Sequence, residues 1–408
     1  MNADITPEIY KLINPIRNYG WGSKSFISTF LGKGSPSVEP EAEMWLGAHP
    51  LASSKVISRG KELLLVDLIK ENPKQMLSEN LANRFKNRLP FLFKMLAAEM
   101  PLSIQAHPDK KQAEAGFKKE DSINIPRGSD NRNYKDENHK PELIYALTEF
   151  ELMCGFQPPS EIIKRMEYLR IFQMIPGLNQ LSKDSSANNI RAIFRSLMSV
   201  KAKQAEEYVK ALTEKISLAK ARNDEDRLIF KWIAKLAALH PQDIGVFSPL
   251  ILNVLRLLPG QALFIKAGIL HSYLHGSGLE VMANSDNVLR GGLTHKKIDL
   301  VELDKILKFE PINIQKLQQF DHNKEIIYRT SAEEFQLSRI MLNEEESYEN
   351  SQIKSPEILL CTEGFGKINS QGTRLEFKKG DSIFIPFAVK AYRLTGTMGL
   401  FRVVVPSK

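Results

Sequence analysis

Gln105 and His107, whose side chains are of types that can bind a metal ion, lie two positions apart in a short and otherwise largely apolar segment. An extended backbone would point both side chains, together with Ser103, to one face of a strand. Glu142 and His271 are two further isolated residues of the same character. Amide, carboxylate and imidazole groups can together hold one divalent cation, and zinc, iron, manganese and cobalt all stay open at this point. We therefore expect one metal site built from these four side chains.

Each of these residues taken alone has a simpler interpretation. A single histidine on an apolar strand, such as His271, is more often a hydrogen-bonded core residue than a ligand, so the prediction depends on the combination. The chain has two cysteines, Cys154 and Cys361, which are far apart and form no CxxC pair. A thiolate zinc site and a disulfide framework are therefore not supported.

The bulk composition is that of an ordinary globular chain. With 408 residues it is long enough for two or three domains. Its first residues lack a basic segment followed by an apolar run, and no stretch has the roughly 20 apolar residues that span a bilayer. The net charge of +8 is spread along the chain without a long basic run. These features predict a cytoplasmic protein that binds neither membrane nor nucleic acid.

The pattern of apolar and polar residues changes several times along the chain. Residues 1–155 combine short apolar runs with Gly and Pro, which predicts strands and turns, with a helical insert at 65–85. Residues 156–248 have apolar residues three and four apart, which predicts a helical domain whose charges lie on solvated faces. Residues 249–312 and 313–408 return to strand patterns. The expected fold is mainly β with an α-helical insert.

One segment near the end of the chain repeats an earlier one. A Gly turn and an apolar strand at residues 380–386 resemble the Gly turn and strand at 260–266. This echo predicts two related β-barrels. The second has Val389-Lys390-Ala391-Tyr392 where the first has Gly268 to His271, so we expect it to be structural and not catalytic.

Three longer motifs carry a family resemblance. Residues 103–110 (SIQAHPDK), 134–142 (YKDENHKPE) and 279–294 (LEVMANSDNVLRGGLT) occur in this order. They resemble the signature segments of type I mannose-6-phosphate isomerases, which are zinc-dependent cupins. The resemblance extends from residue 18 to about residue 300 and covers the last β-rich part more loosely. Lys266 and His295 depart from it, since the family commonly has proline at both positions, which puts the local loop geometry in doubt.

The resemblance implies a fold, a cofactor and a reaction. The fold would be two cupin (jelly-roll) β-barrel domains plus a helical domain, with the catalytic cupin split into residues 1–155 and 249–312. One zinc ion per chain would be held by Gln105, His107, Glu142 and His271. The reaction would interconvert mannose 6-phosphate and fructose 6-phosphate by moving a proton between C1 and C2 through an enediol.

The catalytic roles are assigned from the position of residues in these motifs. Arg290 would stabilise the enediolate or the bound phosphosugar. Glu280 is the preferred proton shuttle, because a carboxylate inside an apolar strand is costly unless it is paired or functional; an ion pair with a lysine is the alternative. Lys140 would lie in the site, either on phosphate or as a proton carrier. His139 and Asp286 are reserve candidates for acid-base steps.

Five further residues are candidates for substrate binding. Ser103, Lys94 and Lys296 are candidates for the substrate phosphate. Trp21 and Tyr273 are candidates for lining the sugar pocket, although both residue types more often pack a barrel wall.

Two other functional classes remain to be distinguished. One is a sugar-sensing or structural cupin without chemistry, which the joint presence of all four ligands, Arg290 and Lys296 disfavours. The other is a metal-dependent dioxygenase, which the cationic residues near the motifs disfavour. The sequence gives no basis for an oligomer, so a monomer is the default. It also leaves open whether the product enters GDP-mannose biosynthesis or whether mannose is broken down.

Overall fold

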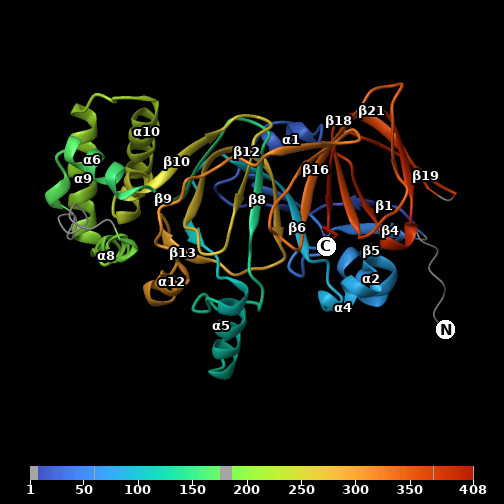
Figure 1. Ribbon diagram of the computed structural model, residues 1–408, viewed down its shortest axis with the longest axis horizontal. Helices are drawn as coiled ribbons and strands as arrows, with labels where there is room; N and C mark the ends of the chain where they lie inside the picture. The colour runs from blue at the N-terminus through green and yellow to red at the C-terminus, as the bar shows by residue number, and fades with distance from the viewer. Residues whose placement is uncertain (1–7, 59, 175–185, 371, 408) are drawn as a thin grey trace.

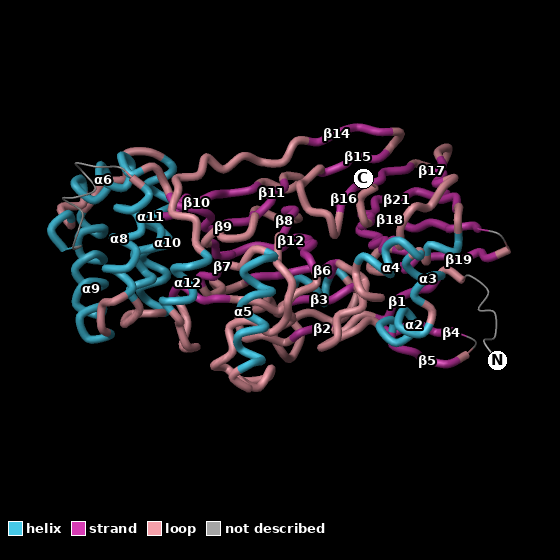
Figure 2. Tube along the Cα trace, turned by 60° about the horizontal axis from the view of Figure 1, so that its bottom comes forward, coloured by secondary structure: helices cyan, strands magenta, loops and turns pink. Residues whose placement is uncertain are grey.

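A computed structural model describes residues 8–58, 60–174, 186–370 and 372–407. The predicted absence of a leader concerns residues 1–7, which lie outside the described residues, and so does the part of the predicted helical domain at 175–185. Along the longest axis, a helical region is followed by one set of strands and then by a second set (Figure 1, Figure 2). The prediction of a mainly β chain with a helical region is confirmed.

The first sheet has ten strands, which contain three of the predicted metal ligands, and the fourth, His107, directly follows β7. The central strand β12 pairs with β6, β7, β8 and β9, always antiparallel. Strands β6, β8 and β9 are buried at every position, so their residues are mostly apolar, and each strand also buries one charged residue: Lys94, Glu142 and Glu151, respectively. Its strands are β2 (Ile16–Arg17), β3 (Glu43–Leu46), β6 (Phe91–Ala98), β7 (Ile104–Ala106), β8 (Glu142–Ala146), β9 (Phe150–Phe156), β10 (Leu252–Leu257), β11 (Ala262–Ile265), β12 (His271–Ala283) and β13 (Leu289–Gly292).

The second sheet joins the end of the chain to its beginning. Tyr10 of β1 pairs with Phe384 of β20, and β4 and β5 continue the sheet beyond β1. Residues 1–155 therefore supply strands to both sheets, and the domain boundaries stay a prediction. The strands are β1 (Tyr10–Ile13), β4 (Lys55–Ser58), β5 (Lys61–Leu64), β14 (Gln319–His322), β15 (Glu325–Tyr328), β16 (Gln336–Leu342), β17 (Ser347–Asn350), β18 (Glu357–Ser370), β19 (Thr373–Lys378), β20 (Ser382–Ile385) and β21 (Tyr392–Val404).

The helical region lies at the end of the molecule away from the second sheet (Figure 1). Its helices are α6 (Pro159–Tyr168), α8 (Ala187–Met198), α9 (Ala202–Leu218), α10 (Asp224–Leu239) and α11 (Ser248–Ile251). The indole of Trp232 on α10 donates to Glu151 of β9 at 2.8 Å, which ties the helices to the first sheet. The prediction of solvated charges is wrong for Arg165, which is buried and donates to the buried Asp226 at 3.2 Å. These partners are distant in the sequence, so helical periodicity could not reveal them.

Further helices lie between the strands along the chain. The predicted helical segment at 65–85 is confirmed as α2 (Leu65–Glu71), α3 (Pro73–Leu77) and α4 (Glu79–Arg84). Ser78 interrupts it with φ +86° and caps α4 by accepting from the backbone N–H of Leu81. The remaining helices are α1 (Phe26–Phe30), α5 (Lys110–Ser122) and α12 (Leu300–Ile306), with 3-10 turns at Phe172–Met174, Ile244–Phe247 and Phe387–Val389.

The echo between the two sheets is present in the backbone. Strands β11 and β20 each follow a glycine in the left-handed region, Gly260 and Gly380, both with φ +92°. Beyond β20, the hydroxyl of the buried Tyr392 donates to Glu357 at 2.8 Å. Arg402 donates to the same carboxylate at 2.6 Å. The second sheet therefore has a self-paired polar cluster in its interior.

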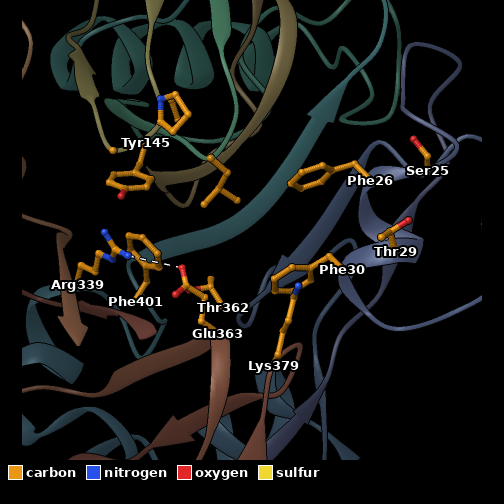
Figure 3. A pocket seen from close by; sticks show the side chains of 14 residues that line it. Ser25, Phe26, Thr29, Phe30, Tyr145, Arg339, Thr362, Glu363, Lys379 and Phe401 are labelled. Atoms are coloured by element: carbon orange, nitrogen blue, oxygen red, sulfur yellow. Dashed lines mark ion pairs between the residues drawn. The ribbon is translucent and has the colours of Figure 1, made fainter. Parts of the chain in front are cut away.

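The two sheets pack on each other through a shared apolar cluster. It includes Phe93 and Val281 from the first sheet and Phe384 and Phe401 from the second. Beside this contact lies a cavity of about 620 Å³, lined by residues of both sheets and of α1 (Figure 3). Among the described residues, no helix is both long and apolar enough to cross a membrane.

Candidate metal centre

Strand pairing brings the predicted ligands together from distant parts of the chain. Gln105 on β7 is opposite His271, the first residue of β12. On its other side Gln105 is opposite Arg290 of β13. Glu142 begins β8 and is opposite Met282 near the end of β12. The alternation inferred for residues 103–107 thus places Gln105 and His107 at the point where three strands meet.

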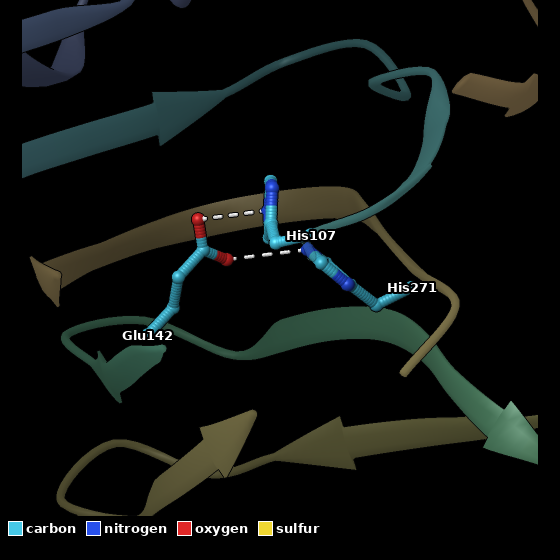
Figure 4. Close-up of side chains that lie close together, drawn as sticks. All are labelled: His107, Glu142 and His271. Carbon is cyan, nitrogen blue, oxygen red and sulfur yellow. Dashed lines mark ion pairs between the residues drawn. The ribbon is translucent and has the colours of Figure 1, made fainter. Parts of the chain in front are cut away.

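His107, Glu142 and His271 form a compact buried cluster (Figure 4). One ligand atom from each lies within 4.8 Å of the others. Nε2 of His107 is 3.2 Å from Oε1 of Glu142, and Nε2 of His271 is 3.2 Å from Oε2 of the same carboxylate. The Gln105 amide is 3.4 Å from Nε2 of His271. All four predicted ligands therefore meet at one place.

The second nitrogen of each histidine is already engaged with the backbone. Nδ1 of His107 lies 2.6 Å from the carbonyl of Asn287, and Nδ1 of His271 lies 2.9 Å from the carbonyl of Ile269. A carbonyl only accepts, so Nδ1 carries the proton in both rings and Nε2 keeps its lone pair. This is the arrangement that orients imidazoles toward a metal ion.

The cluster passes a chemical test for a cation site. Nε2 of His107 and Oε2 of Glu142 are fully buried and have no hydrogen-bond partner, which is costly unless something else satisfies them. Burial lowers the pKa of His107 to about 4, which keeps the ring neutral. Burial alone would raise the pKa of Glu142, but the charge of Lys140 holds that pKa well below its usual value. A neutral imidazole and an ionised carboxylate are the forms that bind a divalent metal.

A second buried network lies beside the cluster. Nζ of Lys94 is 2.9 Å from Glu280 and 3.4 Å from Glu43. Burial lowers the pKa of Lys94, but the two carboxylates outweigh it and raise that pKa above its usual value. Burial and Glu142 raise the pKa of Glu280, against the opposing effect of Lys94. The hydroxyl of Tyr273 donates to Glu280 at 2.9 Å. The ion pair with a lysine, left open from the sequence, is therefore present.

Arg290 and Lys140 lie near the cluster, but only Lys140 makes an ion pair with it. Lys140 is buried, with Nζ 3.2 Å from Oε1 of Glu142. Arg290 is half-buried and makes no ion pair within the described part of the chain. Asp286, the acidic residue four positions before Arg290, lies 3.4 Å from Nε2 of His49 instead. Arg290 thus presents a charge beside Gln105 that feels the exposed Asp130 only at a distance, without an ion pair among the described residues.

The remaining candidate residues make no described contact with the cluster of His107, Glu142 and His271. Ser103 is half-buried, two residues before Gln105, and Lys296 is exposed in the loop after β13. Trp21 packs at the edge of the apolar cluster that contains Tyr273. His139 lies 2.7 Å from Glu334, next to the second sheet. No described contact joins these four residues to the cluster.

Four residues that contribute to the site were not singled out from the sequence. Glu43 accepts from the indole of Trp45 at 2.7 Å as well as from Lys94. His49 is buried against Asp286. Asp136 and Asn287 hold the segment of Glu142 to that of Arg290 through several hydrogen bonds. A single polar residue inside an apolar run was the available signal for Glu43 and His49.

The turn before His271 depends on a glycine. Gly268 has φ +79°, and its N–H donates to the carbonyl of His107 at 2.8 Å. A Cβ at this position would lie 2.8 Å from the carbonyl oxygen of Ile306. Lys266 is exposed at the start of this turn, and His295 is exposed in a separate loop. Neither departure from the family pattern lies among the four ligands.

We expect Gly268→Ala to destabilise the protein by about 1–3 kcal/mol, because alanine rarely adopts this backbone conformation and its methyl group would meet Ile306. The displaced turn should also weaken metal retention. Urea unfolding and elemental analysis measure the two effects. Gly128→Ala is the matched control, since nothing lies within 4 Å of the added methyl group there. Equal stability of both variants would contradict the role of the turn.

The described geometry defines a class of protein: a mainly β, metal-dependent enzyme with a nitrogen and oxygen ligand set at the end of buried strands. Three family models match the chain. Phosphomannose isomerase type I, catalytic domain, matches residues 9–159. Phosphomannose isomerase type I, helical insertion domain, matches 171–252. Mannose-6-phosphate isomerase, cupin domain, matches 324–405.

Relatives and solved structures agree with these matches. The chain is 40% identical over 390 residues to mannose-6-phosphate isomerase of Escherichia coli (strain K12), covering 94% of this chain and 97% of that protein. It is 36% identical over 324 residues to the Homo sapiens protein of the same name, covering 75% and 74%. A crystal structure of mannose 6-phosphate isomerase with zinc bound has a TM-score of 0.90 at 37% identity, covering 98% and 100%. The chain belongs to the type I phosphomannose isomerase family.

Proposed function

We propose that this chain interconverts mannose 6-phosphate and fructose 6-phosphate at one zinc ion held by Gln105, His107, Glu142 and His271. The buried cluster with its two orphaned ligand atoms is the observation that carries the proposal. The names of the relatives support the reaction, and the zinc in a solved structure of 0.90 TM-score supports the metal.

The reaction moves a proton between C1 and C2 of the sugar and develops negative charge on oxygen. Bound zinc supplies Lewis-acid polarisation of the sugar oxygens. Arg290 has a permanent charge and a planar fork, and its lack of an ion pair leaves it free to face a developing oxyanion. Lys140 is fixed against Glu142, which suits a group that positions the substrate near the metal.

Glu280 is proposed as the group that moves the proton. Its carboxylate is buried and its pKa is raised, mainly by burial, which makes it a stronger base than an exposed carboxylate. Lys94 keeps the carboxylate ionised, and Tyr273 orients it. Because Lys94 is already paired, Ser103 and Lys296 are the better candidates for the substrate phosphate. Trp21 and Tyr273 remain candidates for lining the sugar pocket.

We expect Glu280→Gln to abolish exchange of the C2 proton with solvent while zinc content stays normal, because an amide cannot accept the proton. Exchange is measured by incubating mannose 6-phosphate in deuterated water and recording its NMR spectrum. Gln261→Glu, directly before β11, is a control for altered charge near the same sheet. Normal exchange in Glu280→Gln would assign the proton transfer to another group, of which His139 and Asp286 are the next candidates.

The direct test of function is a coupled assay on the purified protein. Mannose 6-phosphate should be converted to fructose 6-phosphate, a chelator should stop the reaction, and added zinc should restore it. Binding of the sugar without turnover would favour a sugar-sensing cupin. Oxygen consumption dependent on iron would favour a dioxygenase. Either result would overturn the proposed isomerase.

We further propose that the chain acts as a monomer in the cytoplasm on a small phosphosugar, and not on nucleic acid. Both cysteines, Cys154 and Cys361, are free and buried, which fits a reducing compartment. The product would serve GDP-mannose biosynthesis or the breakdown of mannose. Sedimentation of the purified protein tests the monomer, and a chain mass of 46.3 kDa is the expected result.

A further inference from the structure

The cavity between the two sheets has aromatic walls on opposite sides. Tyr145 of β8 and Phe401 of β21 contact each other edge to face, with ring centroids 4.7 Å apart. Phe30, from α1, lies on the other side of the cavity (Figure 3). A volume of about 620 Å³ lies within the range of small-molecule sites. The walls therefore suit a flat ring.

Two cations and one carboxylate also face this cavity. Arg339 of β16 and Lys379 line it together with Glu363 of β18. Nη2 of Arg339 is 3.6 Å from Oε1 of Glu363, which is longer than a hydrogen bond, and the Glu363 side chain is 61% exposed. The carboxylate is thus a loosely held counterion. Together the three groups leave one net positive charge.

The Arg339 side chain has an unused donor. Its Nε is buried and has no hydrogen-bond partner, which is costly for a charged group. The guanidinium carbon is 5.9 Å from the centre of the Phe401 ring, and Nζ of Lys379 is 5.6 Å from the centre of the Phe30 ring. Each cation therefore lies beside an aromatic wall. An anion attached to a ring would pair with the accessible nitrogens of both cations and lie against both walls, and would reach Nε only if the Arg339 side chain turned.

We propose that this cavity binds a ring-bearing phosphate ester of the size of a nucleoside monophosphate. Its phosphate would displace Glu363 and accept hydrogen bonds from Arg339 and Lys379. Its ring would pack against Phe30 and Phe401. None of His107, Glu142 and His271 lines the cavity, so this site is separate from the metal centre and does not depend on the proposed isomerase activity.

The two sites are nevertheless connected through one strand. Tyr145 is three residues after Glu142 on β8, a distance of about 10 Å along an extended strand. The cavity is also bounded by both sheets, so a bound ligand would contact both and oppose their separation. Ligand binding should therefore raise the melting temperature of the whole protein.

The test is a calorimetric titration of the full-length protein with adenosine 5′-monophosphate. We expect Arg339→Gln to weaken binding about tenfold or more, because charge-assisted hydrogen bonds to phosphate are lost. Lys379→Gln, an exposed position, should weaken it in the same direction. Glu363→Gln should tighten binding, because the competing carboxylate is removed. This opposite sign is specific to an anion that replaces Glu363.

Arg374→Gln is the matched control, since Arg374 is an exposed residue of β19 outside the cavity. Inorganic phosphate and adenosine should each bind more weakly than the nucleotide, and glucose 6-phosphate tests whether an aliphatic ring suffices. Zinc content verifies that each variant is folded. Failure of the nucleotide to bind, or binding unchanged in both Arg339→Gln and Lys379→Gln, would overturn the proposal. Tighter binding of glucose 6-phosphate than of the nucleotide would overturn its aromatic part.

Discussion

His271→Ala should lose zinc and, with it, nearly all isomerase activity. The imidazole is buried, and its Nε2 is 3.2 Å from Glu142, while its Nδ1 is held by the carbonyl of Ile269. Alanine would remove the proposed ligand atom from the cluster. Removing outer partners of metal ligands typically costs 10–100-fold in affinity, so loss of a direct ligand should cost about 100-fold or more. Elemental analysis after dialysis and the coupled assay measure the two losses.

His275→Ala provides a matched control on the same strand. His275 is exposed on β12, four residues beyond His271, so the substitution removes the same side chain without touching the cluster. It should retain zinc and turnover. His271→Gln should recover part of the zinc affinity, because an amide oxygen can serve as a weaker ligand. Full zinc content in His271→Ala would exclude His271 as a ligand and would require a different site.

The sequence predicts the elements of this fold better than their pairing. Alternation and apolar runs indicated the strands, and spacing of three and four indicated the helices, because both patterns are local. The pairing of Tyr10 with Phe384 could not be predicted, since it joins opposite ends of the chain. The buried Arg165 was missed for the same reason: its partner Asp226 lies on a different helix.

In the site, too, residues in local motifs could be predicted, whereas contacts between distant strands could not. Gln105, His107, Glu142 and His271 were predicted from their types and from motifs, and the structure brings them together. The pairing of Lys94 with Glu280 could be foreseen only as an unspecified ion pair, because the two residues face each other across strands β6 and β12. Polar residues whose partners are on another strand carry no local period that would reveal the contact.

Arg290→Ala should lower kcat by about 100-fold or more while leaving zinc content and stability nearly unchanged. Arg290 makes no ion pair within the described residues and is half-buried, so its loss leaves no buried partner charge. Removing one donor to a developing oxyanion commonly costs 100–1,000-fold, about 3–4 kcal/mol.

The separation of kcat from zinc content is what distinguishes catalysis by Arg290 from a structural contribution. Burial lowers the pKa of Arg290, but guanidinium stays charged at any pH of the assay, so the activity it supports should not titrate near neutrality. Arg290→Lys keeps the charge and loses the planar fork, and should recover only part of kcat. Lys297→Ala removes a charge from the following exposed loop and should leave kcat intact. If Arg290→Ala raised KM alone, Arg290 would bind the phosphosugar equally in ground and transition states and would not stabilise the enediolate.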